Sequence, residues 1–150
     1  MALNIRRYVA SDLEAMARIW LDASRIGHPF LGEEILAEQL KLVRDMYLPQ
    51  AETWVAHDGM EPVGFIGLLE SHVGGLFVDP ARHGRGDGRA LVEHAAELKG
   101  ELSVDVYALN TKALGFYGKL GFFEQSRRPN DDEGRPFELV RMIRTPAGET

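Results

Sequence analysis

The sequence predicts a mixed α/β fold, and the order of its segments and two of its connections support this class. Segments with strand-like and helix-like patterns follow one another in the order β-α-α-β-β-β-α-β-α-β-β along the 150 residues. The Asp58-Gly59 pair predicts a hairpin between antiparallel strands. A helical segment separates the apolar runs 73–80 and 102–109, so these two runs can form neighbouring parallel strands. The expected sheet is therefore mixed.

The first third of the chain predicts one strand followed by two helices. Residues 3–9 are rich in β-branched and aromatic side chains, which favours a strand. Ser11 is placed to cap the next helix, and Glu14 stands where a capping box needs an acidic residue. The apolar stripe of that helix consists of Leu13, Met16, Ala17 and Trp20. A second helix is expected from about Glu33 until Pro49 stops it. Its stripe consists of Leu36, Leu40, Val43 and Tyr47.

The remaining segments predict six more strands and two more helices. The strands are expected at 53–57, 62–70, 73–80, 102–109, 122–128 and 137–144. Apolar side chains recur at helical spacing in 89–98 and 111–120. Gly100 suits the end of the first of these helices, and Asn110 suits the N-cap of the second. The polar segment 128–136 predicts a solvated loop.

Composition excludes several classes of function. Lys and Arg number 17 against 23 Asp and Glu, and the net charge of −6 argues against a broad nucleic-acid-binding face. The chain has no cysteine, so it can form neither a disulfide nor a thiolate metal site. No segment approaches the roughly 18 apolar residues of a membrane span, and the N-terminus lacks the pattern of a signal peptide. We expect residues 1–150 to form one domain that works in the cytoplasm without a membrane or nucleic-acid partner.

The stretch 83–88, His-Gly-Arg-Gly-Asp-Gly, stands between a strand pattern and a helix pattern. Free main-chain N–H groups and the positive end of the helix would meet there, an arrangement that suits an anion. Positive charge also gathers here, at Arg82, His83, Arg85 and Arg89. Asp87 is a carboxylate inside the expected anion site, and it could be satisfied at the helix N-terminus by pointing away from the phosphates. A tight turn that needs glycine for its shape alone is the other interpretation.

The kind of phosphate ligand can be narrowed by comparing motifs. A P-loop would require Gly-Lys-Ser/Thr, which is absent, and Arg89 stands where a dinucleotide motif needs its third glycine. The chain instead resembles the GNAT (Gcn5-related) N-acetyltransferases in two motifs. One is LFVDPARHGRGDGRALVEHA, with Gly86 and Gly88 in the glycine places, and the other is VYALNTKALGFYGKLGFFE, with its asparagine, FY and LGF. His83 departs from the family's arginine or glutamine, and Asp87 replaces a residue that is commonly apolar.

The resemblance implies a GNAT fold, with a central, mostly antiparallel sheet splayed between its fourth and fifth strands. It implies acetyl-CoA as co-substrate, with the pantetheine arm in the splayed cleft, bonded to the backbone near Phe77 and Val78. The pyrophosphate would bind the amides of the glycine stretch. The remaining cofactor-binding residues expected from the resemblance are His83, Gly84, Arg85, Gly86, Asp87, Gly88, Arg89 and Asn110.

Acetyl transfer to an amine requires a proton for the departing thiolate and an acceptor for the proton of the amine. By resemblance, Tyr117 is the general acid; its helical spacing with Leu114 and Leu120 is equally typical of core packing. Glu70, His72 and His28 are candidate bases, although solvent exposure or loop packing explains each of them too, and a water chain would also serve. His28 and Phe30, in a stretch similar to that of small bacterial members acting on protein or peptide amines, are expected to bind the acceptor together with Glu70.

Two classes of function follow from this interpretation. The first is an acetyl-CoA-dependent N-acetyltransferase acting on a lysine of a peptide or protein, or on a small-molecule amine. The alternative is a non-catalytic acyl-CoA-binding sensor with the same fold. The five histidines lack ligand spacing, so no metal is expected. The chain is expected to be a monomer or a homodimer, and the last strand, 137–144, could pair two copies if its edge is exposed.

Overall fold

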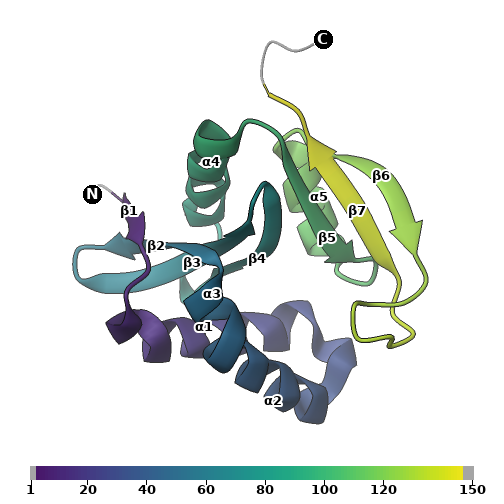
Figure 1. Ribbon diagram of the computed structural model, residues 1–150, viewed down its shortest axis with the longest axis horizontal. Coiled ribbons are helices and arrows are strands. Elements are labelled where there is room, and N and C mark those ends of the chain that lie inside the picture. The colour runs from purple at the N-terminus through teal and green to yellow at the C-terminus, as the bar shows by residue number, and fades with distance from the viewer. Residues whose placement is uncertain (1–2, 147–150) are drawn as a thin grey trace.

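The computed structural model describes residues 3–146, and its element order agrees with the sequence prediction (Figure 1). The strands are β1 (Leu3–Arg7), β2 (Glu52–Asp58), β3 (Glu61–Leu69), β4 (His72–Val78), β5 (Leu102–Tyr107), β6 (Phe123–Arg128) and β7 (Leu139–Arg144). The helices are α1 (Leu13–Gly27), α2 (Gly32–Leu42), α3 (Leu48–Gln50), α4 (Asp87–Lys99) and α5 (Thr111–Lys119). Short 3-10 turns at 10–12, 29–31 and 80–82 join some of these elements.

The strands form one seven-stranded sheet in the order β1-β2-β3-β4-β5-β7-β6. Its neighbouring strands are antiparallel except for β4 and β5, which are parallel. The mixed, mostly antiparallel sheet is therefore confirmed. The Asp58-Gly59 hairpin is also confirmed, with Gly59 at a φ of 63°.

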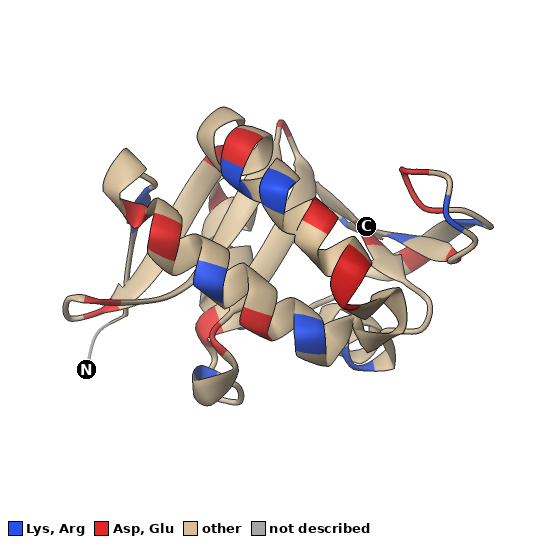
Figure 2. Ribbon diagram, turned by 90° about the horizontal axis from the view of Figure 1, so that it is seen from below, with Lys and Arg blue, Asp and Glu red and all other residues tan. Residues whose placement is uncertain are grey.

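Helices cover both faces of the sheet (Figure 1). The core accordingly consists of two clusters, one on each face. α4 and α5 bury Leu91, Val92 and Tyr117 against one face. α1 and α2 bury Trp20 and Leu36 against the other. β5 shows why the strand pattern was readable, because its residues alternate between buried and partly exposed along its whole length. Acidic and basic residues are interspersed along the helices (Figure 2).

The start of α1 differs from the prediction. The expected capping box of Ser11 and Glu14 is wrong, because the chain enters α1 through a 3-10 turn that Asp12 organises. The Asp12 carboxylate accepts a hydrogen bond of 2.9 Å from the amide of Val9 and pairs with Arg6. Asp12 is buried by this arrangement, and the paired Arg6 holds the pKa of its carboxyl below the ordinary value.

Two further expectations about the elements are corrected. Pro49 does not stop the helical run ahead of it: a π-helical turn at 43–47 follows α2, and helical residues continue through α3 to Gln50, one residue beyond Pro49. The last strand does not offer a free edge for a second copy. β7 lies between β5 and β6, and β6 is the edge strand.

Candidate active site

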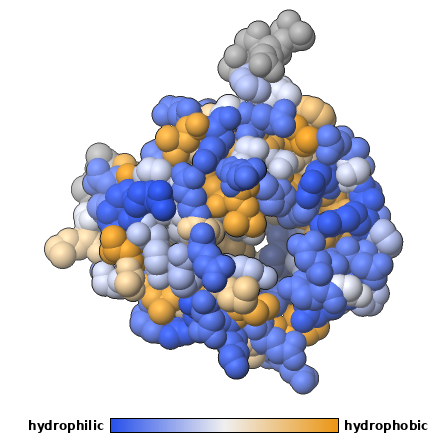
Figure 3. Space-filling view, in the orientation of Figure 1, coloured by the Kyte–Doolittle hydropathy of each residue, from blue (hydrophilic) through white to orange (hydrophobic). Residues whose placement is uncertain are grey.

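The parallel pair of strands is short, and this opens the middle of the sheet. β4 and β5 pair only at His72 with Ser103 and at Val73 with Val104. Beyond these pairs the later residues of β4 and β5 have no partner across the gap, although β5 remains paired with β7. The expected splay between the fourth and fifth strands is thus confirmed. A hollow is visible near the middle of the molecule, in the region between the two parts of the sheet (Figure 3).

The course of β4 along this gap is set by a bulge and by aromatic packing. The register with β3 shifts so that Gly74 has no direct partner. The ring of Phe77 lies over Gly75, where an added Cβ would come within 2.7 Å of the ring. Trp20 and Phe65 hold the same ring, with centroids 6.0 and 5.5 Å away. Phe77 and Val78, whose backbone was expected to bind the cofactor, come after the last residue of β4 that pairs with β5, so this part of β4 lies along the gap.

The glycine stretch forms a cradle of free amides directly after β4. Within the described part of the chain, the main-chain N–H groups of residues 84–89 have no hydrogen-bond acceptor. Gly84 and Gly86 have φ angles of 85° and 84°, which require glycine. A Cβ at either position would meet no atom within 4 Å, so neither glycine is enclosed by other parts of the chain on that side. We call residues 84–89 the amide cradle; it lies at the N-terminus of α4, where the helix dipole favours an anion.

Gly88 serves a purpose that the motif does not reveal. An added Cβ at Gly88 would approach the ring of Phe116 on α5 to 3.2 Å and the side chain of Val78 to 3.7 Å. This position therefore lets α4 pack closely against α5 and the end of β4. Unlike Gly84 and Gly86, Gly88 needs its small size for packing between elements of the fold.

Some of the charged residues expected around the cradle are paired within the protein, and the others are exposed to solvent. Arg82 binds Asp87 and Asp58 through its guanidinium, so it is engaged within the protein. Asp87 is buried, and its carboxylate accepts a hydrogen bond from Arg82. A carboxylate held in this way is compatible with an anion bound at the neighbouring amides. The ring of His83 lies 3.2 Å from the carbonyl oxygen of Val78. Arg85 is exposed, as are His83 and Arg89.

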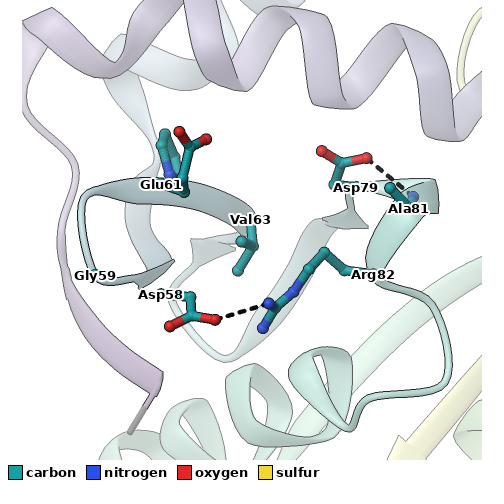
Figure 4. Close-up of a pocket in the computed structure, with 8 residues that line it drawn as sticks. Asp58, Gly59, Glu61, Val63, Asp79, Ala81 and Arg82 are labelled. Atoms are coloured by element: carbon teal, nitrogen blue, oxygen red, sulfur yellow. Dashed lines mark hydrogen bonds and ion pairs between the residues drawn. The ribbon is translucent and has the colours of Figure 1, made fainter. Parts of the chain in front are cut away.

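A surface pocket beside the turn 80–82 is not suited to a phosphate. Its lining includes the carboxylates of Asp58, Glu61 and Asp79 as well as Arg82 (Figure 4). Arg82 reaches toward Asp58, while Asp79 turns back and accepts a hydrogen bond of 3.0 Å from the amide of Ala81. Because carboxylates dominate this lining, an anion is favoured at the amide cradle and not here.

Tyr117 lies on α5 in the core that faces α4. Its ring contacts Phe116 and Phe122, with both centroid distances 5.1 Å, and only 6% of the residue is exposed. Burial raises the pKa of its phenol, so the hydroxyl keeps its proton at neutral pH. Packing, one of the two interpretations of this residue, is therefore present; it does not exclude proton donation from a hydroxyl that stays protonated.

Asn110 is a helix cap, as predicted. Its side-chain oxygen accepts a hydrogen bond of 3.2 Å from the amide of Ala113 at the start of α5. Its amide nitrogen lies close to the end of α1, since a Cβ added at Gly27 would approach it to 3.2 Å. Asn110 thus contacts α1 as well as α5, at the end of β5.

His28 and Phe30 belong to an aromatic cluster that sequence reasoning only half identified. The ring of His28 lies 5.0 Å from Tyr107 and 5.8 Å from Phe30, and Phe30 lies 5.3 Å from Phe137. We call His28, Phe30, Tyr107 and Phe137 the aromatic cluster. It joins the turn after α1, the end of β5 and the loop before β7, so residues distant in sequence meet at the open end of the gap.

Asp131 holds the loop of this cluster in place. Its carboxylate accepts a hydrogen bond of 2.9 Å from the Tyr107 hydroxyl and further bonds from the amides of Glu133 and Arg135. Burial, followed by the bond to Asp131, raises the pKa of Tyr107. The only sequence signal for this arrangement was the acidic, turn-rich composition of 128–136, which does not say which carboxylate is buried.

The half-buried imidazole of His28 predicts a loss of stability in acid. Burial lowers the pKa of its imidazole from 6.5 to about 4. Between these two pH values His28 is protonated in the unfolded chain and neutral in the folded chain. The stabilisation is complete above about pH 6.5 and disappears as the pH falls toward 4, by up to about 3 kcal/mol. Urea unfolding at pH 7 and pH 4.5 should show this loss, and His28→Asn should reduce it. An equal loss in the variant would contradict the assignment.

Glu70 and His72 lie apart from the aromatic cluster. Glu70 is an exposed turn residue with a φ of 56°, between β3 and β4. His72 is bonded to the Ser103 hydroxyl at 2.8 Å and lies 3.7 Å from the carboxylate of Asp105. Both belong to the end where β4 and β5 are paired, whereas Tyr107 is at the other end of β5. The structure therefore does not bring Glu70 together with His28 and Phe30.

The residues present fit the acetyl-CoA that the motifs imply. The amide cradle offers unpaired donors for a pyrophosphate, and the free edge of β4 offers backbone groups for the amides of a pantetheine arm. When bound, acetyl-CoA supplies an activated acyl group. Among residues 3–146, no group of three or more His, Asp or Glu side chains is placed to hold a metal ion. None of the helices in the described chain is both long and apolar enough to span a membrane.

Comparisons with known proteins agree with this geometry. A family model for the acetyltransferase (GNAT) domain matches residues 49–124. Peptidyl-lysine N-acetyltransferase YjaB of Salmonella typhimurium strain LT2 is 42% identical over 144 residues, which are 95% of this chain and 99% of that protein. The solution structure of apo-form YjaB from Escherichia coli covers 98% of this chain and 100% of its own, with a TM-score of 0.89 and 39% identity.

A more distant structure shares the fold alone. The PaiA N-acetyltransferase of Thermoplasma acidophilum, solved in complex with coenzyme A, has a TM-score of 0.80 at 16% identity, over 97% of this chain and 99% of its own. The similarity to YjaB over nearly the whole chain favours an enzyme over a non-catalytic acyl-CoA sensor. The chain belongs to the GNAT family and is an N-acetyltransferase.

Proposed function

We propose that this N-acetyltransferase moves acetyl from acetyl-CoA directly to the side-chain amine of a lysine in a peptide or protein. One observation carries the proposal: β4 and β5 part after two residue pairs, and β4 leads into the amide cradle while β5 ends in the aromatic cluster. A donor held by the cradle and an acceptor entering past the cluster would meet in the gap. The similarity to proteins named peptidyl-lysine N-acetyltransferases supports lysine as the acceptor.

The transfer forms one bond from the amine nitrogen to the carbonyl carbon and breaks the carbon–sulfur bond. The neutral amine gives up one proton, which passes through water to solvent, and the departing sulfur takes one. We assign the second proton to the Tyr117 hydroxyl, which burial keeps protonated until it is needed. Transfer from an ordinary phenol of pKa about 10 to a thiolate of about 8.5 is uphill by about 2 kcal/mol, and the burial that raises the pKa of Tyr117 increases this cost. Tyr117 then regains a proton from solvent.

We assign His28 and Phe30 to acceptor binding and not to proton removal. With a pKa of about 4, the His28 imidazole is a weak base toward an ammonium group. Its aromatic neighbours instead offer faces against which the alkyl chain and charge of a lysine can pack. Asp132 and Glu133, exposed on the same loop as Asp131, would attract a basic peptide.

The proposal is tested by following thiol release from acetyl-CoA with the purified chain and a set of basic, lysine-containing peptides. The expected result is release that depends on the peptide, with the acetyl group found on lysine Nζ by mass spectrometry. Matched peptides with arginine in place of lysine are the control and should give only background release. Equal release with the arginine peptides, or none with any lysine peptide, contradicts a peptidyl-lysine acceptor.

Removing one ring of the aromatic cluster should weaken acceptor binding selectively. We expect Phe30→Ala to raise the KM for the peptide about tenfold, the loss of roughly 1.4 kcal/mol of packing, with the affinity for CoA unchanged. Steady-state kinetics in the peptide and a CoA titration measure the two quantities. Phe123→Ala, which removes an exposed ring on the edge strand β6, is the matched control. A change in CoA affinity without a change in peptide KM would count against this assignment.

A further inference from the structure

A buried carboxylate stands beside the amide cradle, and a single arginine compensates it. Asp87 is the first residue of α4, and only 4% of its side chain is exposed. Arg82 donates to it twice, from Nε at 3.0 Å and from Nη2 at 3.3 Å. The same guanidinium donates from Nη1 to Asp58 at 2.8 Å, at the end of β2. Arg82 thus ties the turn before the cradle to the β2–β3 hairpin (Figure 4).

Because of this position, the charge of Asp87 would affect how strongly the cradle binds an anion. Asp87 directly follows Gly86, and its own amide is one of the free donors of the cradle. An unpaired carboxylate here would be repelled by a bound pyrophosphate and would compete for the same positive helix end. Asp58 differs, because its side chain is 20% exposed and water can solvate it if Arg82 is lost.

We propose that Arg82 is a positioning residue for the cofactor: it neutralises Asp87 and fixes that carboxylate away from the cradle, so that residues 84–89 can accept the pyrophosphate of acetyl-CoA. Arg82 acts through Asp87 and does not itself touch the ligand. The inference rests on the proposed function for the identity of the ligand. A purely structural ion pair is the alternative, and it predicts effects on stability alone.

The test compares CoA binding by calorimetric titration in four variants of the full chain, with thermal unfolding of each. Arg82→Met leaves Asp87 buried and unpaired. Asp87→Asn removes the negative charge at nearly constant size, and the double variant combines both changes. Lys99→Met is the matched control, because the Lys99–Glu52 ion pair joins the opposite end of α4 to β2 with similar exposure, 23% and 28%.

The expected result is that Arg82→Met weakens CoA binding about tenfold or more, whereas Asp87→Asn in the same chain brings the affinity back to within about threefold of the wild-type value. Asp87→Asn alone should bind CoA at least as tightly as the wild type. Lys99→Met should lower the unfolding temperature without changing CoA affinity. Rescue of binding by removal of a charge is a result that a merely structural pair does not produce.

Other outcomes separate this inference from the proposed function. If the wild-type chain binds CoA and Arg82→Met binds it equally well, the role of Arg82 is overturned while the function stands. If Asp87→Asn weakens CoA binding as much as Arg82→Met, the ion pair only holds the structure in place, and the proposal that Arg82 neutralises Asp87 is wrong. If the wild-type chain does not bind CoA, the proposed function is overturned and the inference with it. Should Arg82→Met fail to fold, Arg82→Gln takes its place, because it also removes the positive charge and can keep a hydrogen bond to Asp87; unchanged CoA binding by that variant overturns the role of Arg82.

Discussion

Tyr117→Phe should lower kcat about 100-fold or more while the affinity for CoA stays within about threefold of the wild-type value. The variant keeps the ring contacts with Phe116 and Phe122 and loses only the hydroxyl. Protonation of the departing sulfur must then come from water, which is less well placed, so the loss belongs to the chemical step. Stability should change little, because the packing of the ring is preserved.

Steady-state kinetics with saturating peptide, together with a CoA titration, measure the two effects separately. Tyr47→Phe is a suitable control, since 51% of Tyr47 is exposed and it lies outside the proposed site. It should leave kcat and CoA affinity unchanged. A Tyr117→Phe enzyme with wild-type kcat would remove Tyr117 from the mechanism and leave it as a core residue.

Gly86→Glu should abolish measurable CoA binding. Gly86 has a φ of 84°, which a residue with a Cβ adopts only at a cost, so the amide cradle would be distorted. The new side chain would also bring a negative charge next to the free amides, where a pyrophosphate is expected. Steric and electrostatic effects therefore act in the same direction.

The strain of the substitution can be separated from its effect on the cradle. Gly121 also has a positive φ, 94°, and open space for a Cβ, in the turn between α5 and β6. Gly121→Glu should cost stability of the same order, about 1 kcal/mol, and leave CoA binding intact. Calorimetric titration of both variants is the measurement. Unimpaired binding by Gly86→Glu would show that the pyrophosphate lies elsewhere.

Much of the fold could be predicted because local patterns matched the final environment. The alternation of 102–107 became the half-buried strand β5, and the capping oxygen of Asn110 was recognised from its place before a helical repeat. The start of α1 was predicted wrongly for a reason that is also physical. Ser11, Asp12 and Glu14 all suit a helix start, and the choice was decided by Arg6, whose position on β1 the local sequence does not determine.

The candidate site was predictable where its parts are continuous in sequence. The amide cradle occupies a single stretch, so its glycines signalled it directly. The aromatic cluster joins His28 to Tyr107 and Phe137, and the engagement of Arg82 depends on Asp58 in a separate hairpin. These contacts exist only because the topology of the sheet brings distant segments together, and no spacing within the sequence encodes them.

The gap between β4 and β5 also bears on self-association. Unpaired strand edges normally recruit strands of other molecules, and most sheets expose such edges only at their rims. Here two unpaired edges face each other inside the sheet, beyond Val73 and Val104, with β3 behind one and β7 behind the other. A strand from a second molecule would have to enter between them instead of docking from the side. The protein can therefore keep these backbone donors and acceptors vacant for a slender ligand, while the strand edges that a second molecule can reach from the side are those of β1 and β6.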